Sequence, residues 1–159
     1  MNKRLTIALV AHDNRKADMV EWCYFNSDFL AKHRLVCTGT TGQLIKEAFE
    51  QKGVKADITC MNSGPLGGDA EIAAMVVRHE VDLAIFLIDD LNAQPHEADI
   101  MMLLRQCRVH NVPIACNRYS ADLMLTSSLW DEESYCPTMP RYEKFDREKF
   151  YKKYGKYSV

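Results

Sequence analysis

Three short polar segments of the sequence combine residue types that could carry out proton-transfer chemistry. Asn62-Ser63-Gly64-Pro65-Leu66-Gly67-Gly68-Asp69 is a glycine-rich bend that ends in a carboxylate, and Thr38-Gly39-Thr40-Thr41-Gly42 has the composition of an anion-binding loop. Pro95-His96-Glu97-Ala98-Asp99 offers a histidine and an acid. A carboxylate base, an anion cradle and a histidine electrophile together would suit proton abstraction beside a carbonyl in a small phosphorylated molecule.

The threonine-rich segment, residues 38–42, lies between a predicted strand and a predicted helix that starts near Gln43. Its glycines allow several backbone N–H groups to converge, and the helix N-terminus adds partial positive charge. The hydroxyls of Thr38, Thr40 and Thr41 would add donors around a phosphate. The alternative is a capping turn in which the threonines only satisfy the helix end.

A histidine and a lysine follow the first predicted strand, in the segment Ala11-His12-Asp13-Asn14-Arg15-Lys16. Asp13 or Asn14 is expected to cap the next helix, which leaves Lys16 in the first turn. A lysine at that position is slightly disfavoured by the helix dipole, and a ligand anion would account for it. The alternative is a solvated lysine beside a capping aspartate.

Asp69 and His96 are the two candidate catalytic side chains. Asp69 follows two glycines that permit close backbone approach, and it could equally be the N-cap of the helix behind it. Pro95 before His96 and Asp99 three residues on would fix the position of the imidazole and its tautomer. The alternative for His96 is a structural or solvated histidine.

These segments must be positioned by alternating strands and helices. Short apolar runs predict strands at residues 5–11, 35–38, 58–62, 83–88 and 114–117, and apolar residues at helical spacing lie between them. Such alternation implies an α/β fold with a parallel sheet of about five strands and helices on both sides. The candidate segments all follow strands, at the carboxyl ends where open α/β sheets bind ligands.

The composition is that of an ordinary soluble globular protein. The 159 residues suit one domain, and a formal net charge of −2 favours neither nucleic acid nor a membrane as partner. The apolar N-terminal stretch is too short to span a membrane, and no signal-cleavage site follows it. Six scattered cysteines predict reduced, buried thiols, among them Cys37, Cys60 and Cys116 in apolar runs, and hence a cytoplasmic protein.

No zinc-ligand spacing, P-loop, dinucleotide fingerprint or nucleophile elbow is present in the sequence. We therefore expect no metal site. The composition changes beyond Leu129, and residues 141–157 are rich in Lys, Arg, Tyr and Phe with acids interleaved. The sequence thus predicts a domain over residues 1–128 and an extension over residues 129–159 that packs on the domain or on a neighbouring subunit.

Five motifs follow one another along the chain between about Leu5 and Ser128. They are Ile7-Ala8-Leu9-Val10-Ala11-His12-Asp13, Thr38-Gly39-Thr40-Thr41-Gly42, Ser63-Gly64-Pro65-Leu66-Gly67-Gly68-Asp69, Leu91-Asn92-Ala93-Gln94-Pro95-His96 and Asn111-Val112-Pro113-Ile114-Ala115. Together they closely resemble the methylglyoxal synthase family. The GGD and PHxxD pieces are specific, since related ligand-binding domains share the fold and the threonine loop but not these.

The resemblance implies a three-layer, Rossmann-like α/β domain with a five-stranded parallel sheet and helices on both faces, a homohexamer, and no cofactor. It implies conversion of dihydroxyacetone phosphate to methylglyoxal and inorganic phosphate. Matched residue by residue, the family's catalytic base falls on Asp69, and His96 and Asp99 match its other catalytic groups. The implied substrate contacts are His12, Asp13, Lys16, Thr38, Gly39, Thr40, Thr41, Ser63, Gly64 and Asp89.

The chain departs from the family pattern in a longer stretch at residues 47–55, in Asp90 where a proline is common, and in its basic, aromatic tail. Two other functions share part of the pattern. A regulatory module like the allosteric domain of carbamoyl phosphate synthetase would keep the phosphate loop and need no base. A different lyase or isomerase could act on a similar sugar phosphate through the same enediolate.

Overall fold

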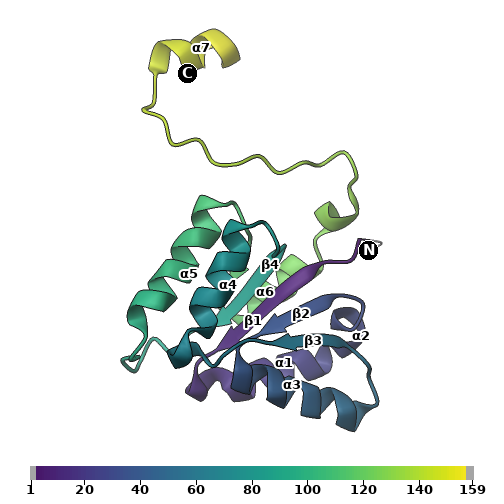
Figure 1. Cartoon of the computed structure of the whole chain (residues 1–159). Helices are drawn as coiled ribbons and strands as arrows, with labels where there is room; N and C mark the ends of the chain where they lie inside the picture. The colour runs from purple at the N-terminus through teal and green to yellow at the C-terminus, as the bar shows by residue number, and fades with distance from the viewer. Residues whose placement is uncertain (1–2, 157–159) are drawn as a thin grey trace.

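The computed structural model of the chain describes residues 3–156. Five strands form one parallel sheet in the order β3-β2-β1-β4-β5, and helices lie on both sides of it (Figure 1). The strands are β1 (Thr6–Ala11), β2 (Arg34–Cys37), β3 (Asp57–Cys60), β4 (Leu83–Leu87) and β5 (Ile114–Ala115). The helices are α1 (Lys16–Phe25), α2 (Ser27–Leu30), α3 (Gly39–Lys52), α4 (Gly68–Val77), α5 (Glu97–Val109), α6 (Arg118–Leu125) and α7 (Arg147–Tyr154), with 3-10 turns η1 (Asp13–Arg15), η2 (Gly64–Leu66) and η3 (Ser128–Asp131).

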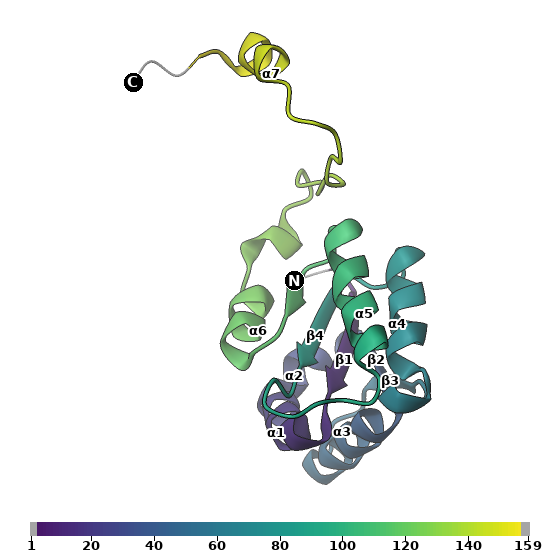
Figure 2. The same cartoon turned by 90° about the vertical axis from the view of Figure 1, so that its left-hand side faces the viewer.

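Successive side chains of the central strand enter two different apolar cores. Ile7 and Leu9 belong to the core shared with α1, α2, α3 and α6, whereas Ala8 and Val10 belong to the core shared with α4 and α5. The two helical layers lie on opposite sides of the sheet (Figure 2). Because both faces are covered, every residue of β4 is buried, which explains its continuous apolar sequence. The predicted three-layer α/β fold is confirmed.

The predicted strands agree with the observed ones to within two residues at each end, and the difference at the last strand has a clear physical reason. This strand was expected to reach Asn117 but ends at Ala115. Asn117 instead caps α6, because its side-chain oxygen accepts a hydrogen bond of 2.8 Å from the Ser120 amide. The apolar face of α6, Ala121 and Leu125, joins the core beside α1.

All six cysteines are free thiols, but the predicted burial holds only in part. Cys23, Cys37 and Cys107 are buried, whereas Cys60, Cys116 and Cys136 are exposed. The prediction of burial was wrong for Cys60 and Cys116 because Cys60 ends the edge strand β3 and Cys116 directly follows the edge strand β5, where one side has no neighbouring strand. Among residues 3–156, no helix has the length and apolar character needed to cross a membrane.

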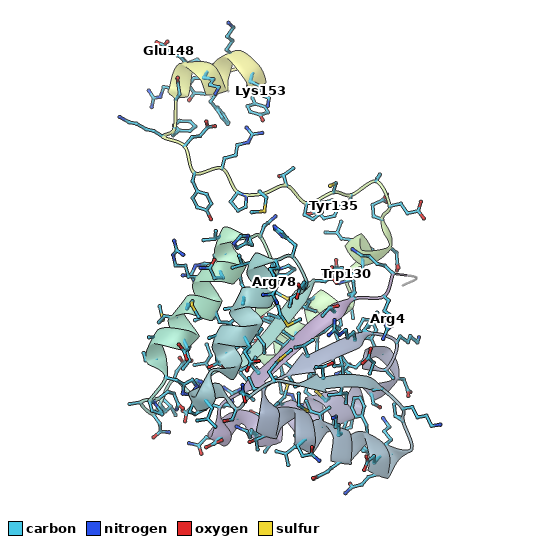
Figure 3. The ribbon with its side chains drawn as sticks, in the orientation of Figure 1. Arg4, Arg78, Trp130, Tyr135, Glu148 and Lys153 are labelled. Atoms are coloured by element: carbon cyan, nitrogen blue, oxygen red, sulfur yellow. The ribbon has the colours of Figure 1, made fainter. Side chains whose placement is uncertain are left out.

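The C-terminal extension leaves the body of the domain after η3, in which Trp130 still packs on the core and donates to the Met124 carbonyl (2.7 Å). Residues 132–146 are exposed, and α7 lies apart from the sheet and its helices (Figure 3). Further along the extension, the Thr138 carbonyl accepts a hydrogen bond from Asn111 Nδ2 (2.7 Å), which joins this exposed segment to the domain. Its packing on a neighbouring subunit stays a prediction, and the predicted outer boundaries at residues 1 and 159 lie outside the described residues.

The two-sided burial of β4 predicts a large loss of stability on truncating Phe86, which is fully buried opposite Val10 of β1. Phe86→Ala should lower the free energy of unfolding by about 3–5 kcal/mol, because it removes apolar contacts and leaves a cavity. Urea denaturation measures this change. Val77→Ala, on the exposed side of α4, is the control and should change stability by no more than about 0.5 kcal/mol. Similar values for both variants would contradict the assigned core.

Candidate active site

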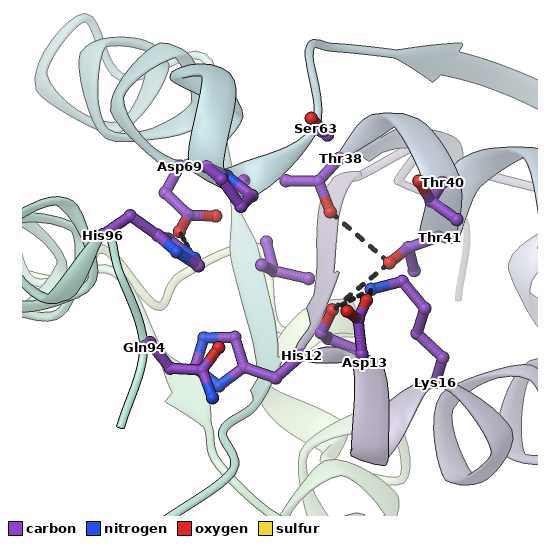
Figure 4. Close-up of a pocket in the computed structure, with 14 residues that line it drawn as sticks. His12, Asp13, Lys16, Thr38, Thr40, Thr41, Ser63, Asp69, Gln94 and His96 are labelled. Carbon is purple, nitrogen blue, oxygen red and sulfur yellow. Dashed lines mark hydrogen bonds and ion pairs between the residues drawn. The ribbon is translucent and has the colours of Figure 1, made fainter. Parts of the chain in front are cut away.

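A cavity of about 230 Å³ lies where the carboxyl ends of β1, β2 and β3 meet the loop before α5 (Figure 4). The segments that follow these strands turn over its mouth, so residues far apart in the sequence share one space. Ten of the thirteen predicted site residues line it. The lining is formed by Val10, Ala11, His12, Asp13, Lys16, Thr38, Thr40, Thr41, Ser63, Gly64, Pro65, Asp69, Gln94 and His96.

The threonine loop forms the start of α3 and one wall of the cavity. Thr38 occupies the N-cap position, but its side chain makes no capping hydrogen bond and instead lies 3.4 Å from the Thr41 hydroxyl. The amide of Gly39 donates to the Asn62 carbonyl, whereas those of Thr40 and Thr41 have no intrahelical acceptor in the first turn. The geometry therefore favours the anion-binding interpretation over the capping turn.

Lys16 brings a positive charge to the cavity. Its Nζ donates to the Asp13 carboxylate (2.7 Å) and to the Ala11 carbonyl (3.1 Å), so the ammonium is held over the end of β1. The Lys16 ammonium lowers the pKa of Asp13 through this hydrogen bond. The expected capping by Asp13 or Asn14 was wrong, because Asp13 pairs with Lys16 and Asn14 donates to Asp89 (2.9 Å).

Asp69 lies inside the first turn of α4, and it is fully buried. It is not the N-cap, since Gly67 occupies that position and no side chain caps the helix. Neither carboxylate oxygen has a hydrogen-bond partner among the described residues. Burial raises the pKa of Asp69, and the nearby His96 and Lys16 oppose this while Asp99 adds to it. A carboxylate in this state is a stronger base than one in water.

His96 lies directly beside Asp69 on the wall of the cavity. Its Nε2 lies 3.1 Å from Asp69 Oδ2, close enough for an ion pair but not aligned for a hydrogen bond. Gly64 lies beside both, since a Cβ at this position would be 3.0 Å from His96 Nε2 and 3.4 Å from each Asp69 oxygen. A side chain at this position would therefore fill the space in front of the carboxylate and the imidazole, where a substrate must approach both groups.

A second imidazole, His12, is fixed by the backbone. The Asp89 amide donates to its Nδ1 at 2.8 Å, so the ring proton must reside on Nε2. Burial lowers the pKa of His12, which favours the neutral ring. The Nε2 atom is buried without a partner among residues 3–156. The ring stands edge-on to Phe86 and to His96, at centroid distances of 5.2 and 5.5 Å.

Three predicted site residues do not line the cavity. Gly39 turns its amide to Asn62, and the Asp89 carboxylate accepts from Asn14, Asn92 and the Leu91 amide. Asp99 lies in the first turn of α5. Its backbone amide, and not its carboxylate, makes the bond to His96, by donating to the His96 carbonyl oxygen. The expected fixing of the His96 tautomer by Asp99 is not seen, since His96 Nδ1 has no partner in the described part of the chain.

Sequence reasoning missed Gln94, which lines the cavity between His12 and His96 in Figure 4. Its signal was its place in a polar loop two residues before His96. It also missed the hydrogen bonds that Asn14 and Asn92 donate to Asp89. Among the residues described, no group of three or more His, Cys, Asp or Glu side chains is arranged to hold a metal ion.

Comparison with known proteins shows the family to which the chain belongs. A family model described as the MGS-like domain matches residues 18–116. A methylglyoxal synthase of Treponema socranskii is 67% identical over 150 residues, which cover 94% of this chain and 95% of that protein. The chain belongs to the methylglyoxal synthase family. The resemblance read from the five sequence motifs is thereby confirmed.

Other methylglyoxal synthases are similar over most of their length. One from Coxiella burnetii is 45% identical over 139 residues, covering 87% of this chain and 93% of its own. The crystal structure of methylglyoxal synthase from Elizabethkingia anophelis NUHP1 superposes with a TM-score of 0.75 at 42% identity, and 88% of each chain is covered. The fold is therefore that of the methylglyoxal synthase family.

Opposite pKa shifts predict opposite effects of two Asp→Asn substitutions on stability at neutral pH. The folded-state pKa of Asp69 is raised, so its ionisation disfavours folding once the pH rises through that pKa. Asp69→Asn should increase the free energy of unfolding by about 1–3 kcal/mol. The reason is that the variant no longer buries an ionised carboxylate that has no hydrogen-bond partner. Thermal denaturation at pH 7 measures the change.

The matched control is Asp89→Asn. Hydrogen bonds from Asn92 and Asn14 lower the pKa of Asp89, so its ionisation favours folding above the unfolded-state pKa and this contribution is lost as the pH falls. Asp89→Asn should therefore lower the midpoint temperature at pH 7. A fall for Asp69→Asn as well would mean that the buried Asp69 carboxylate does not destabilise the fold.

Proposed function

We propose that the chain converts dihydroxyacetone phosphate to methylglyoxal and inorganic phosphate. The observation that carries this proposal is the buried Asp69 carboxylate, 3.1 Å from His96 in a cavity whose other wall is the threonine loop with Lys16. A base, imidazole donors and a phosphate site thus meet in one space. Membership of the methylglyoxal synthase family supports the same reaction.

The first step is removal of a proton by Asp69 from the carbon that bears the substrate hydroxyl. The electron pair of that C–H bond moves toward the neighbouring carbonyl and gives an enediolate. The raised pKa of Asp69 reduces the difference between the pKa of the base and that of the weakly acidic C–H group. Burial also keeps water, a competing source of protons, away from the carboxylate.

The negative charge of the enediolate gathers on oxygen, where imidazole N–H groups can stabilise it. The tautomer of His12 places a neutral Nε2–H in the cavity, and His96 Nε2 lies next to the base. We assign both rings to the oxygen end of the substrate, with His96 as the principal electrophile. A neutral imidazole is well matched to this role because it does not transfer its proton outright.

The second step breaks the bond between carbon and the phosphate oxygen. The electron pair of the enediolate forms a new double bond, and inorganic phosphate leaves with the C–O pair. The remaining enol gains a proton on its terminal carbon, loses the proton of its hydroxyl and becomes methylglyoxal. Lys16, the amides of Thr40 and Thr41, and Ser63 are the groups we assign to the leaving phosphate.

The two alternative functions fit the site less well. A regulatory module would need the phosphate loop. It would not explain why Asp69 is buried beside His96 without a hydrogen bond to any residue that the structure describes. An isomerase could use the same base and enediolate, but it must hold the C–O bond to phosphate in the plane of the enediolate. Elimination instead requires that bond to align with the π system, and the family relationship favours this outcome.

We further propose a homohexamer that acts in the cytoplasm. The resemblance to the methylglyoxal synthase family supports the hexamer, and the free state of all six cysteines supports a reducing compartment. Leu66 in η2 and Leu91 in the loop before α5 are 77% and 94% exposed. Large apolar side chains on the rim of a site suit contact with another subunit.

The reaction is tested by incubating pure protein with dihydroxyacetone phosphate and following methylglyoxal and phosphate together. The wild type should release the two products in equal amounts. Asp69→Asn keeps the size of the side chain but cannot accept the proton, so kcat should fall by about 10²–10⁴-fold or more in a protein that stays folded. Near-normal turnover of this variant would remove Asp69 from the role of base.

Two ligands, phosphoglycolate and inorganic phosphate, test the oxygen end and the phosphate end of the site separately. Phosphoglycolate has a planar carboxylate where the enediolate would lie, so it should bind at least about 10²-fold more tightly than substrate. His96→Ala should weaken phosphoglycolate more than inorganic phosphate, because phosphate alone fills the cradle. Lys16→Ala should weaken both ligands to a similar extent, by about 10- to 150-fold. Calorimetric titration gives all four comparisons, and equal losses for both ligands in the His96 variant would exclude His96 as the electrophile.

A further inference from the structure

Glu71 makes an unusual pair of hydrogen bonds beside the candidate site. One of its oxygens, Oε1, accepts both from the Asn62 backbone amide (3.0 Å) and from Asn62 Nδ2 (2.7 Å). Glu71 lies in the first turn of α4, two residues after Asp69. Two residues correspond to about 200° around a helix, so Asp69 faces the cavity while Glu71 faces the loop that follows β3.

Asn62 is also joined to the phosphate side of the cavity. Its carbonyl accepts from the Gly39 amide (3.1 Å) at the start of α3, and it directly precedes Ser63 and Gly64. Gly68 at the start of α4 packs against the same carbonyl so closely that a Cβ there would overlap it. Asn62 therefore joins the helix that carries the threonine loop to the helix that carries the base.

We propose that Glu71 is a positioning residue that sets the orientation of the bound phosphate relative to Asp69, an inference that rests on the proposed function. Glu71 holds Asn62 by two bonds, and Asn62 holds the start of α3. The distance between the base and the phosphate cradle is thus fixed through the Glu71 side chain and the Asn62 backbone and side chain, which lie outside the cavity lining.

The two chemical steps depend on this distance to different degrees. Proton abstraction requires Asp69 to reach one C–H bond. Elimination requires in addition that the C–O bond to phosphate align with the π system of the enediolate, so a small rotation of the cradle reduces it strongly. Loosening the cradle should therefore slow elimination more than proton abstraction, and the enediolate should return more often to substrate.

A purely structural role would give a different result. Asn62 is exposed, so water can replace Glu71 as the acceptor for its amide and side chain, and the fold should tolerate the loss. If Glu71 only stabilised the fold, its removal would lower the amount of active enzyme and would reduce both steps equally. The ratio of the two steps separates these possibilities.

The experiment measures both steps in D₂O with dihydroxyacetone phosphate. Nuclear magnetic resonance follows deuterium entering the remaining substrate, which reports on proton abstraction and return, together with methylglyoxal, which reports on elimination. Glu71→Ala should lower the rate of elimination by about 10- to 100-fold and raise the ratio of exchange to elimination by about fivefold or more. Glu71→Gln keeps an oxygen at the Oε1 position and should restore a near wild-type ratio.

The matched control is Glu80→Ala. Glu80 follows the other end of α4 and accepts two hydrogen bonds from Arg78 (2.8 and 3.1 Å), but it lies outside the cavity. This variant should keep the wild-type ratio. Asn62→Ala, which removes only the Nδ2 donor, should raise the ratio less than Glu71→Ala and serves if the latter does not fold.

An unchanged ratio in Glu71→Ala, or in Asn62→Ala if Glu71→Ala does not fold, would overturn the proposal, and so would a Glu71→Gln variant that behaves like Glu71→Ala. These results differ from a failure of the proposed function. If the wild type forms no methylglyoxal and exchanges no deuterium, the chemistry itself is wrong. If the wild type is active and all variants share its ratio, the chemistry stands and only the role of Glu71 is rejected.

Discussion

The site depends on one unfavourable arrangement, the burial of the Asp69 carboxylate without a hydrogen bond to any residue in the described range 3–156. A carboxylate in water is too weak a base to remove a proton from carbon, and desolvation corrects this at the expense of stability. The surrounding structure must therefore hold Asp69 in place by the backbone of α4. The large apolar core of the sheet and helices supplies the stability that makes this possible.

The parallel sheet provides that rigidity and also gathers the chemical groups. Because all five strands run in one direction, the segments after β1, β2 and β3 and the loop that follows β4 reach the same edge. Each contributes a different function: His12 and Lys16, the threonine loop, Ser63 with Asp69, and His96. Hydrogen bonds between these segments, such as those of Asn62 to Gly39 and to Glu71, hold them together. The segments are therefore less free to move than four separate loops would be.

The fold and most of the cavity could be predicted from the sequence because they follow from local patterns. Apolar runs located the strands, and glycine with polar residues located the loops after them. The hydrogen bonds of Asp13, Asn14 and Asp89 could not be predicted. The local sequence does not distinguish a polar side chain that caps the next helix from one that bonds to a residue far along the chain. Gln94 was missed for a related reason: which side of a loop faces a cavity depends on tertiary structure.

The backbone bond to His12 has a consequence beyond orientation. An imidazolium carries hydrogen on both nitrogens, so protonating His12 would set an Nδ1–H against the Asp89 N–H and break their hydrogen bond. The ring can accept a proton only if the loop after β4 moves. The Asp89 main-chain amide thus opposes protonation of this ring in the same direction as burial, which lowers the pKa of His12, so the fold favours one chemical form of the histidine.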